Sequence, residues 1–455
     1  MKRFFSITIW LLLCIMLLSA CTPGKANNTP ETTVPRDFSG EATKQDDPVS
    51  LDIYYLEDDA CSFYIAKTFY AKDVTVNATA FSSLEEMDTR IATEINGNKG
   101  PDVILFPSDS SLDTTKMALN GAFLDLSDML TGDETYDANN YYSVLDAGNI
   151  GGQQLLMPLR FRFPYYYTTQ ERMTAAGVDL PENYTASQLM TAFHAAASSL
   201  DDDYCWMAYD IPMSYGAMIY DPLRLSGIEI ADLQGQTLSI TEEVLREYSN
   251  FAQLMEAELW KARNILQNFG TDFTGGWTHL YSICDNEQFP LYLRYYESLY
   301  KKGLNETIEI LPIPNYDDPA SLTADISLYA AVLQSSDHVE TAFKFVRYAM
   351  DIALGETGYD LPISRRSVAS HLDRLCLSPG KTIKLPNGSV TVSAMSKELR
   401  LQCEQTLDRI TSGSIRSGVI DDIFTEAMEP YIKGEADFED CFTKFQNQMS
   451  LYLYE

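Results

Sequence analysis

Hydrophobic and polar positions in the first part of the folded chain switch regularly between strand-like and helix-like periods. Residues 51–55 alternate as a strand does, residues 74–81 are rich in β-branched side chains, and residues 102–106 are continuously apolar. Between them, residues 62–72 and a segment that begins at Ser83 repeat their apolar positions at helical spacing. This order predicts a β-α-β-α-β unit with parallel strands, and therefore an α/β fold.

The two predicted helices carry specific signals. Ser83 and Glu86 form a capping box that opens the second helix, and Gly97 is suited to end it. The apolar face of the first helix is predicted to comprise Tyr64, Ile65, Thr68 and Phe69, and that of the second Leu84, Met87, Ile91 and Ile95. Ligands of parallel sheets bind beyond the carboxyl ends of the strands, here residues 56–59, 82–83 and 107–110. Ser83 is interpreted mainly as a helix cap.

The remaining pattern predicts further strands and helices. Strands are expected within residues 204–210, 278–284, 307–318 and 325–333. Helices are expected at 185–200, 241–259, 291–303 and 339–350. The apolar faces of the second and fourth of these comprise Val244, Tyr248, Phe251, Met255 and Leu259, and Val339, Ala342, Phe343, Val346 and Met350. The last hundred residues are predicted to be mostly helical, with a hairpin at 381–392.

The amino terminus has the pattern of an export signal. Lys2 and Arg3 precede an apolar run, residues 4–20, which is shorter than the roughly 20 residues of a membrane-spanning helix. The run ends at Leu18-Ser19-Ala20-Cys21, which resembles the bacterial lipobox and implies lipidation of Cys21 (diacylglycerol and palmitate) after removal of a signal peptide, residues 1–20. A plain signal peptide with an accidental cysteine is the alternative.

Residues 21–49 are predicted to be a flexible tether. They are rich in Thr, Pro, Gly, Asn and charged residues, and such a segment buries too little apolar surface to offset its ordering entropy. About 405 of the 455 residues follow it, a length that favours two lobes. The sequence thus predicts a folded body that a lipid holds on the extracytoplasmic face of a cell membrane.

Charge and cysteine spacing exclude several classes of function. Removal of Lys2 and Arg3 with the signal changes the formal net charge from -32 to -34, and so acidic a surface repels nucleic acid. The cysteines after Cys21 form no C-x-x-C pair, and whether they form disulfides stays open at this point. The four histidines are far apart, and no metal, nucleotide or nucleophile motif occurs. No cofactor, bound metal or catalytic residue is therefore expected.

Four segments, taken in order, resemble a known family. Residues 81–106 contain a helix and a Gly-Pro-Asp turn before a core strand, and residues 157–189 resemble a crossover strand that is followed by a helix and a proline turn. Residues 310–350 and 358–368 resemble a proline-rich strand, a second crossing strand with its helix, and a late Leu-Pro segment. The family is that of the bacterial extracellular solute-binding lipoproteins of ABC importers (family 1), including maltose- and oligosaccharide-binding members. Tyr184-Thr185 stands where many members have a Trp.

The resemblance implies a type II periplasmic-binding-protein-like fold, with two lobes joined by crossover strands and a ligand in the cleft. Lobe one would comprise residues 50–156 and 307–352, and lobe two residues 157–306 and 353–455. Ligand binding would favour hinge closure. It further implies a monomer that delivers a carbohydrate, in particular an oligosaccharide, to ABC permease subunits in the membrane and makes or breaks no bond.

Candidate ligand-binding residues follow from these positions. Aromatic rings cover the apolar faces of sugars, while carboxylates, amides and Arg bind hydroxyls. The candidates are Glu57, Asp58, Ser108, Asp109, Phe161, Arg162, Trp206, Tyr209, Tyr215, Trp277 and Asp325, with Arg365 as an outside possibility. Core packing of the two Trp residues and a solvated surface position for the acidic residues are the competing interpretations.

Three alternative functions remain open. The same fold could bind a polyamine, a peptide, a metal or another small solute, and the acidic composition favours a cation. A lipid-anchored glycosidase would need two carboxylates at a defined separation, which 65 acidic residues could supply. A purely structural protein would bind no ligand and would not close.

Overall fold

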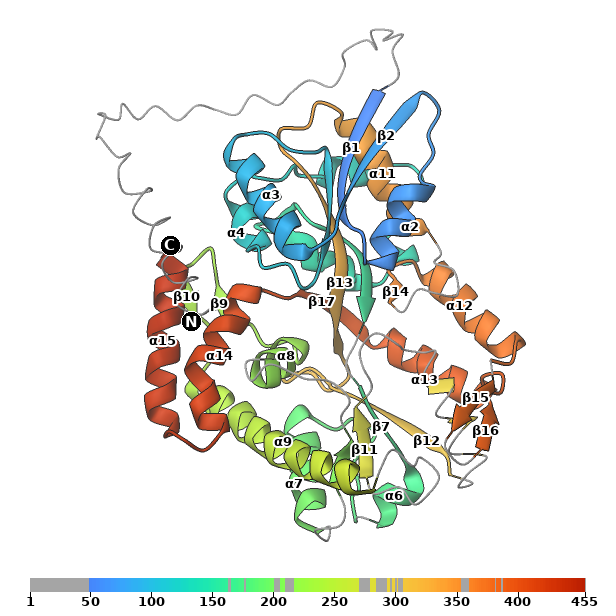
Figure 1. The fold of residues 1–455 in the computed structure, drawn as a ribbon, viewed down its shortest axis with the longest axis vertical. Helices are drawn as coiled ribbons and strands as arrows, with labels where there is room; N and C mark the ends of the chain where they lie inside the picture. Colours follow the sequence, from blue (N-terminus) through green and yellow to red (C-terminus); the bar gives the residue numbers. More distant parts are fainter. Residues whose placement is uncertain are drawn as a thin grey trace. The chain divides into compact units, whose positions relative to one another are not determined.

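The computed structural model describes most of the chain from Val49 onward, and Figure 1 shows its fold. The described residues are 49–162, 165–175, 177–199, 205–208, 217–269, 279–283, 293–294, 297–298, 301, 306–352, 360–380, 382–385 and 388–454. The chain divides into two units, Met1–Asp46 and Asp47–Glu455, of which the second is described here. The predicted signal peptide, Cys21 and the tether to residue 48 lie outside the described residues.

The predicted parallel unit is confirmed. Strand β1 (Val49–Leu56) pairs in parallel with β2 (Val74–Phe81) along its whole length and with β3 (Val103–Pro107). Helices α2 (Ala60–Thr68) and α3 (Leu84–Asn96) connect the strands. All but the last residue of β3 are buried, as its continuous apolar run predicts.

Strand β13 (Leu322–Val332) is the centre of the first sheet, and all its residues are buried. It runs antiparallel to β3 and to β6 (Met157–Arg162), and β6 also pairs with β14 (Leu361–Pro362). Strand β17 (Ile410–Ile415) lies parallel to β13. The sequence did not predict β17, because its Ile-Thr-Ser-Gly-Ser-Ile segment has neither an apolar run nor a strong strand composition.

The second sheet has four strands. Its order is β12 (Ile308–Pro312), β7 (Tyr165–Thr169), β11 (His279–Ile283) and β8 (Cys205–Ala208). Here β7 runs antiparallel to both neighbours, whereas β11 and β8 are parallel. Consecutive strands β6 and β7, and likewise β12 and β13, therefore belong to different sheets, so the chain passes between the two sheets at these points.

The packing partners of several elements differ from the expected lobe boundaries; for example, β14 and β17, placed in lobe two, pair in the first sheet. Strand β6, placed at the start of lobe two, pairs in the first sheet, and β12, placed in lobe one, pairs in the second. Helices α12 (Arg365–Leu377) and α13 (Lys397–Asp408), placed in lobe two, contribute buried side chains to the same core as the first sheet. Lobe membership depends on the partner against which each element packs, which local periodicity does not encode.

The first core contains the inward side chains of the first sheet and of the helices that cover it. Helix α3 begins at Ser83, whose Oγ accepts from the Glu86 N–H as the capping box predicts, and it ends at Gly97. Its Met87 and Ile91 are buried. Helix α11 (Val339–Asp351) buries Ala342, Phe343, Val346 and Met350 of the predicted face, whereas Val339, its first residue, is only half-buried. Short helices α4 (Thr114–Leu119) and α5 (Ser127–Gly132) complete this part, which we call the first lobe.

The second core belongs to a mainly helical part, which we call the second lobe. It contains α6 (Gln170–Ala175), α7 (Ala186–Ser199), α8 (Ala217–Leu225), α9 (Glu242–Phe269), α14 (Gly418–Ile432) and α15 (Phe438–Tyr454). Helix α9 buries Tyr248, Phe251 and Met255, as predicted. Figure 1 shows α14 and α15 side by side, and Phe424 and Phe445 join them with ring centroids 4.7 Å apart.

The described residues also include two short 3-10 helices, η1 (Ala138–Asn140) and η2 (Ser143–Gly148), and three short hairpins. The hairpins are β4 (Asn149–Ile150) with β5 (Gln153–Gln154), β9 (Ala231–Asp232) with β10 (Thr237–Leu238), and β15 (Thr382–Leu385) with β16 (Gly388–Thr391). The last of these confirms the hairpin predicted around residue 387. Cys61, Cys376, Cys403 and Cys441 are free thiols, whereas the side chain of Cys205, and Cys284 altogether, lie outside the described residues.

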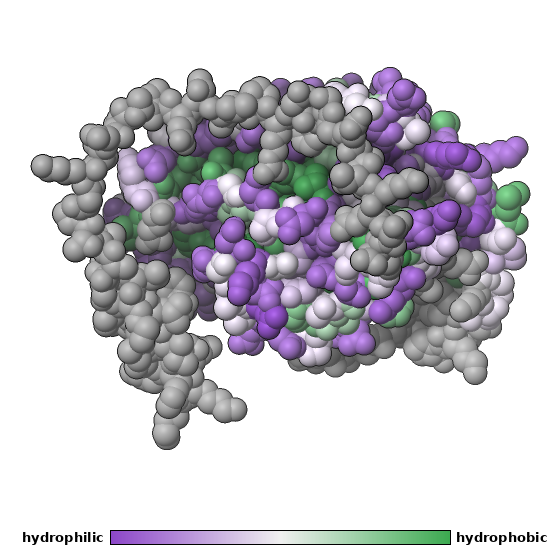
Figure 2. Space-filling view, turned by 90° about the horizontal axis from the view of Figure 1, so that it is seen from above, coloured by the Kyte–Doolittle hydropathy of each residue, from purple (hydrophilic) through white to green (hydrophobic). Residues whose placement is uncertain are grey.

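Hydrophilic residues dominate the face shown in Figure 2, and hydrophobic residues appear in a hollow between them. This agrees with the strongly acidic composition. Within the described ranges, no helix is both long enough and apolar enough to cross a membrane.

The ion pair between Asp133 and Arg347 predicts a pH dependence of stability. Arg347 Nε donates to Asp133 across 2.7 Å, and this hydrogen bond lowers the pKa of the carboxyl group to about 2. Because that pKa lies below the ordinary value of about 4, the pair stabilises the fold at neutral pH, and this stabilisation is lost as the pH falls from about 4 to about 2. Denaturant titrations across this range should show the decrease. Asp133→Asn should be less stable at pH 7, and its free energy of unfolding should fall less steeply between about pH 4 and about pH 2. An unchanged pH dependence in this variant would show that the Asp133–Arg347 pair is not its cause.

Candidate functional site

The carboxyl ends of the three parallel strands present polar side chains, as the sequence predicts. Glu57 and Asp58 follow β1 and are exposed, and the Glu57 N–H donates to the Phe81 carbonyl at the end of β2. Asp59 has a structural role, because its carboxylate accepts from the N–H groups of Cys61 and Ser62 and thereby caps α2. After β1, the carboxylates exposed at this edge are therefore those of Glu57 and Asp58.

The loop between β3 and α4, residues 108–113, is held in a fixed conformation. The Ser108 N–H donates to the Ser327 carbonyl on β13. Farther along, the buried carboxylate of Asp88 on α3 accepts from Ser110 Oγ at 2.9 Å and from both the N–H and Oγ of Ser111 at 2.7 Å. Ser108 is itself buried, whereas Asp109 is exposed. The loop is thus a rigid support that presents Asp109 to solvent.

Arg162 and Asp325, both predicted as site residues, form an ion pair where the strands cross. Arg162 Nε donates to Asp325 Oδ2 at 2.9 Å, and its Nη2 reaches Ser108 Oγ at 3.3 Å. The other Asp325 oxygen accepts from Nη1 of Arg224 on α8 at 2.6 Å. One buried carboxylate therefore joins β6 and β13 of the first sheet to a helix of the second lobe.

The two arginines keep Asp325 charged although its side chain is 1% exposed. Burial by itself would raise the pKa of Asp325, but the charges of Arg224 and Arg162 outweigh burial and hold the pKa below its usual range. Both oxygens are occupied by guanidinium donors. In this structure Asp325 therefore positions the crossing strands, and contact with a ligand remains a prediction for it.

Arg416 extends the charged network on the side of the second lobe. It lies between β17 and α14, donates to Asp421 at 2.7 Å and approaches Asp221 at 3.6 Å. Asp221 in turn accepts from Arg224 at 2.7 Å. The guanidinium of Arg416 also lies 4.0 Å from the exposed carboxylate of Asp109. The network, which sequence reasoning missed, spans from the β3–α4 loop to α14. Arg224 and Arg416 each have one partner nearby in sequence, Asp221 and Asp421, but their bonds to Asp325 and Asp109 join segments that are distant in sequence and so carry no local signal.

The structure places only some of the aromatic residues that were predicted to contact a ligand. Phe161 is fully buried, and its ring packs edge-to-face against Tyr142 at 5.3 Å, so it offers no surface to a ligand here. Trp206 lies on β8, as predicted, but its side chain is outside the described part, and Tyr209, Tyr215 and Trp277 lie outside it altogether. Arg365, the outside possibility, covers the Tyr142 ring at 4.3 Å.

Helix α2 exposes two aromatic rings that sequence reasoning assigned wrongly or missed. Tyr64 was placed on the apolar face, yet it is 40% exposed, and Phe63, which was not singled out, is 45% exposed. The face that packs inward comprises Cys61, Ser62, Ile65 and Ala66, and Thr68 is also exposed. The cap at Asp59 fixes where the helix begins, and so rotates Phe63 and Tyr64 outward.

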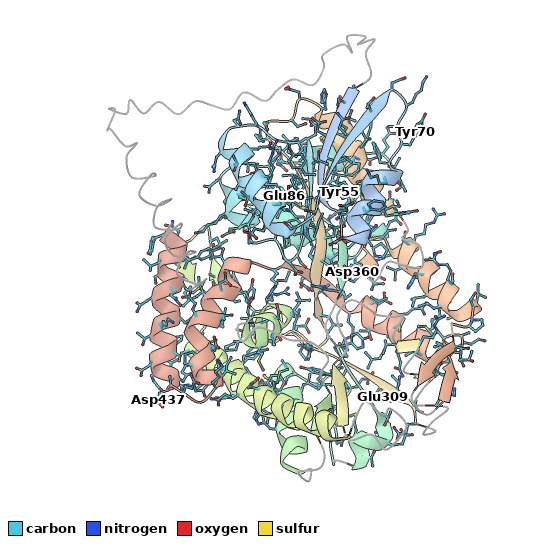
Figure 3. All side chains as sticks on the ribbon, in the orientation of Figure 1. Tyr55, Tyr70, Glu86, Glu309, Asp360 and Asp437 are labelled. Atoms are coloured by element: carbon cyan, nitrogen blue, oxygen red, sulfur yellow. The ribbon has the colours of Figure 1, made fainter. Side chains whose placement is uncertain are left out.

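Phe63 packs near the end of β1, the strand that Glu57 and Asp58 follow. Its ring centroid is 6.4 Å from that of Tyr55, the penultimate residue of β1, and Glu57 and Asp58 follow this strand directly. Figure 3 labels Tyr55 low on the first sheet and Tyr70 at its outer edge. An apolar ring beside two carboxylates can cover the C–H face of a sugar while the carboxylates accept hydroxyl hydrogen bonds.

Comparison with solved structures gives matches over most of the chain. An extracellular solute-binding protein of family 1 from Alicyclobacillus acidocaldarius is 14% identical, with a TM-score of 0.57 over 90% of this chain and 100% of that one. An ABC substrate-binding protein from Listeria monocytogenes, in complex with cycloalternan, is 14% identical, with a TM-score of 0.56 over the same shares. This chain has the two-lobed solute-binding fold.

A third neighbour agrees. The sugar-binding protein of Xanthomonas citri is 12% identical, with a TM-score of 0.57 over 89% of this chain and 98% of that one. No family model matches the sequence, and no curated protein matches it. The resemblance first suggested by ordered sequence segments is therefore confirmed at the level of the fold.

Proposed function

We propose that this protein is the solute-binding component of an ABC importer, which captures a carbohydrate, in particular an oligosaccharide, between its lobes and delivers it to membrane permease subunits. The observation that carries the proposal is the solute-binding fold over about nine-tenths of the chain. The Listeria neighbour is described as bound to cycloalternan, and the Xanthomonas neighbour as a sugar-binding protein. Such a protein makes and breaks no bond in its cargo.

The residues at the carboxyl edge of the first sheet support a sugar as cargo. Phe63 and Tyr64 supply ring surface, and Glu57, Asp58 and Asp109 supply exposed acceptors. Arg162 and Arg224 are both engaged by Asp325. The edge therefore offers rings and acceptors, which suit a neutral molecule with many hydroxyl donors. Ser108, Trp206, Tyr209, Tyr215 and Trp277 remain proposed contacts.

We also propose that Cys21 carries the lipid anchor and that the protein acts as a monomer on the extracytoplasmic face. The support is the charged start, the apolar run to Ala20 and the Leu-Ser-Ala-Cys motif. Mass spectrometry of the amino-terminal peptide of the native protein tests this. An unmodified Cys21 would contradict it.

The test of function is thermal unfolding against a panel of mono- and oligosaccharides, with amino acids and polyamines as controls. A ligand at 100 times its dissociation constant should stabilise the fold by roughly 2.7 kcal/mol. Stabilisation by one sugar class supports the proposal. Turnover of the sugar during the measurement would instead indicate a glycan-active enzyme.

A cationic cargo is the second candidate, because three carboxylates at this edge are exposed while the neighbouring arginines are paired with acids. Calorimetry at two salt concentrations separates the two candidates. Binding of a neutral sugar should change little with salt, whereas a polyamine should bind much more weakly at high salt. Stabilisation by a polyamine alone would overturn the carbohydrate proposal and leave the fold unaffected.

Phe63→Ala should weaken binding of the stabilising sugar by roughly fivefold. Loss of one aromatic contact removes on the order of 1 kcal/mol, and the exposed ring contributes little to the core. Tyr70→Ala is the matched control, because Tyr70 is 85% exposed and lies at the outer edge of the lobe (Figure 3). Isothermal titration of both variants measures the difference. Equal affinities would remove Phe63 from the site.

A further inference from the structure

The last turn of α15 contacts the beginning of α4. Tyr452 Oη donates to Asp113 Oδ2 at 2.6 Å. The ammonium group of Lys116 lies 3.8 Å from the centroid of the Tyr452 ring and also donates to the Tyr452 carbonyl. The two elements are more than 300 residues apart in sequence, so this contact depends on tertiary structure alone.

Each side of the contact is fixed in a different core. Thr114, in the first turn of α4, is buried and lies 3.0 Å from the Tyr329 hydroxyl of β13 in the first lobe. On α15, Phe445 and Met449 are fully buried in the second core. A movement of one lobe against the other therefore has to strain or break the bonds around Tyr452.

The contact includes a hydrogen bond to a charged carboxylate in largely buried surroundings. Asp113 uses Oδ1 to cap α4, accepting from the Lys116 N–H at 2.9 Å, and uses Oδ2 for Tyr452. Tyr452 is 5% exposed, and hydrogen bonds to charged groups in such surroundings exceed those between neutral groups. One carboxylate thus stabilises the helix and joins the lobes.

The contact is continuous with the candidate ligand site. Asp113 ends the same loop that begins with Ser108 and Asp109, and Asp88 fixes the middle of that loop through Ser110 and Ser111. Because this loop is held rigid, a displacement of Asp113 at its end is expected to displace Ser108 and Asp109 at its beginning. Tyr452 is therefore linked through this loop to the candidate ligand site, although it is not itself one of the candidate ligand contacts.

We propose that the carboxyl-terminal turn of α15 is a latch, formed by Tyr452 on Asp113 and Lys116, that restrains movement between the lobes. The latch deepens the proposed function, since it sets how readily the lobes move for cargo. Its test measures contacts within the chain and needs no cargo, so failure of the carbohydrate proposal would leave the test unaffected.

The experiment is hydrogen–deuterium exchange on the full chain with three variants. Tyr452→Phe removes the hydroxyl and keeps the ring, and Lys116→Met removes the ammonium group. Tyr431→Phe is the matched control, because its hydroxyl makes a 2.6 Å bond to Asn250 within the second lobe. The latch predicts about tenfold faster exchange at the beginning of α4 and at the end of α15 in the first two variants. The control should leave both segments unchanged.

Small-angle scattering of the same samples completes the test. The double variant Tyr452→Phe/Lys116→Met should have a larger radius of gyration than Tyr431→Phe, with unchanged far-ultraviolet circular dichroism showing that it is folded. Faster exchange confined to α15, or equal radii of gyration, would overturn the latch, because the contact would then be local packing.

Discussion

Asp325→Ala is expected to lower the free energy of unfolding by about 3–5 kcal/mol, because removal of one partner of a buried ion pair leaves the other charges uncompensated. The carboxylate is 1% exposed, and the Arg224 side chain is 5% exposed. Denaturant unfolding at pH 7 measures the loss. The effect should exceed that of an ordinary surface substitution, which lies within about 0.5 kcal/mol.

Two comparisons make the Asp325 prediction specific. Asp128→Ala changes an exposed carboxylate in the first turn of α5 and should be nearly neutral. Replacing Asp325 and its two arginines by apolar residues, as in Asp325→Leu/Arg162→Met/Arg224→Met, should recover much of the loss, since these three charges are then removed together and Asp221 keeps Arg416 nearby. If the single and triple variants were equally unstable, packing around β13 and not charge would be the cause.

Phe424→Ala is expected to lower the free energy of unfolding by about 3–5 kcal/mol through loss of a large buried side chain and the cavity it leaves. Its ring is fully buried, 5.6 Å from that of Tyr220 on α8 and 4.7 Å from that of Phe445 on α15. Three helices of the second lobe meet at this residue. The loss should therefore be concentrated in that lobe.

Hydrogen exchange and unfolding together test the Phe424 prediction. Amides of α8, α14 and α15 should exchange faster in the variant, whereas β1 and β3 of the first lobe should change less. Phe424→Leu should cost less than Phe424→Ala, because it leaves a smaller cavity. Equal acceleration in both lobes would show that the two cores unfold as one cooperative unit.

Asp325 and Phe424 both contribute to the contacts of α8, a helix of the second lobe. Asp325 holds α8 to the crossing strands, and Phe424 holds α8 to α14 and α15. Helix α8 therefore connects the charged network around Asp325 to α14 and, through Phe424 and Phe445, to α15, which carries the proposed latch. Under the proposed function, these contacts would contribute to the free energy of lobe movement.

The sequence by itself determined the local elements of the first lobe. The bounds of β2, the Ser83 cap and the Gly97 end of α3 follow from β-branched composition and capping chemistry, which act within a few residues. The parallel direction of β1, β2 and β3 follows from the helices that connect them. Ordered segments also pointed to the solute-binding fold, although each segment alone is weak.

Tertiary structure decided which residues meet across the chain. The pairing of Asp325 with Arg162 and Arg224, the addition of β17 beside β13 and the burial of Phe161 depend on elements that are far apart in sequence. The apolar periodicity also placed Tyr64 wrongly on the buried face, because four apolar positions in a short helix do not determine how the helix is rotated about its axis. Local chemistry specifies where a helix or strand begins and ends, whereas long-range packing determines its neighbours and hence which charged and aromatic side chains are left for a ligand.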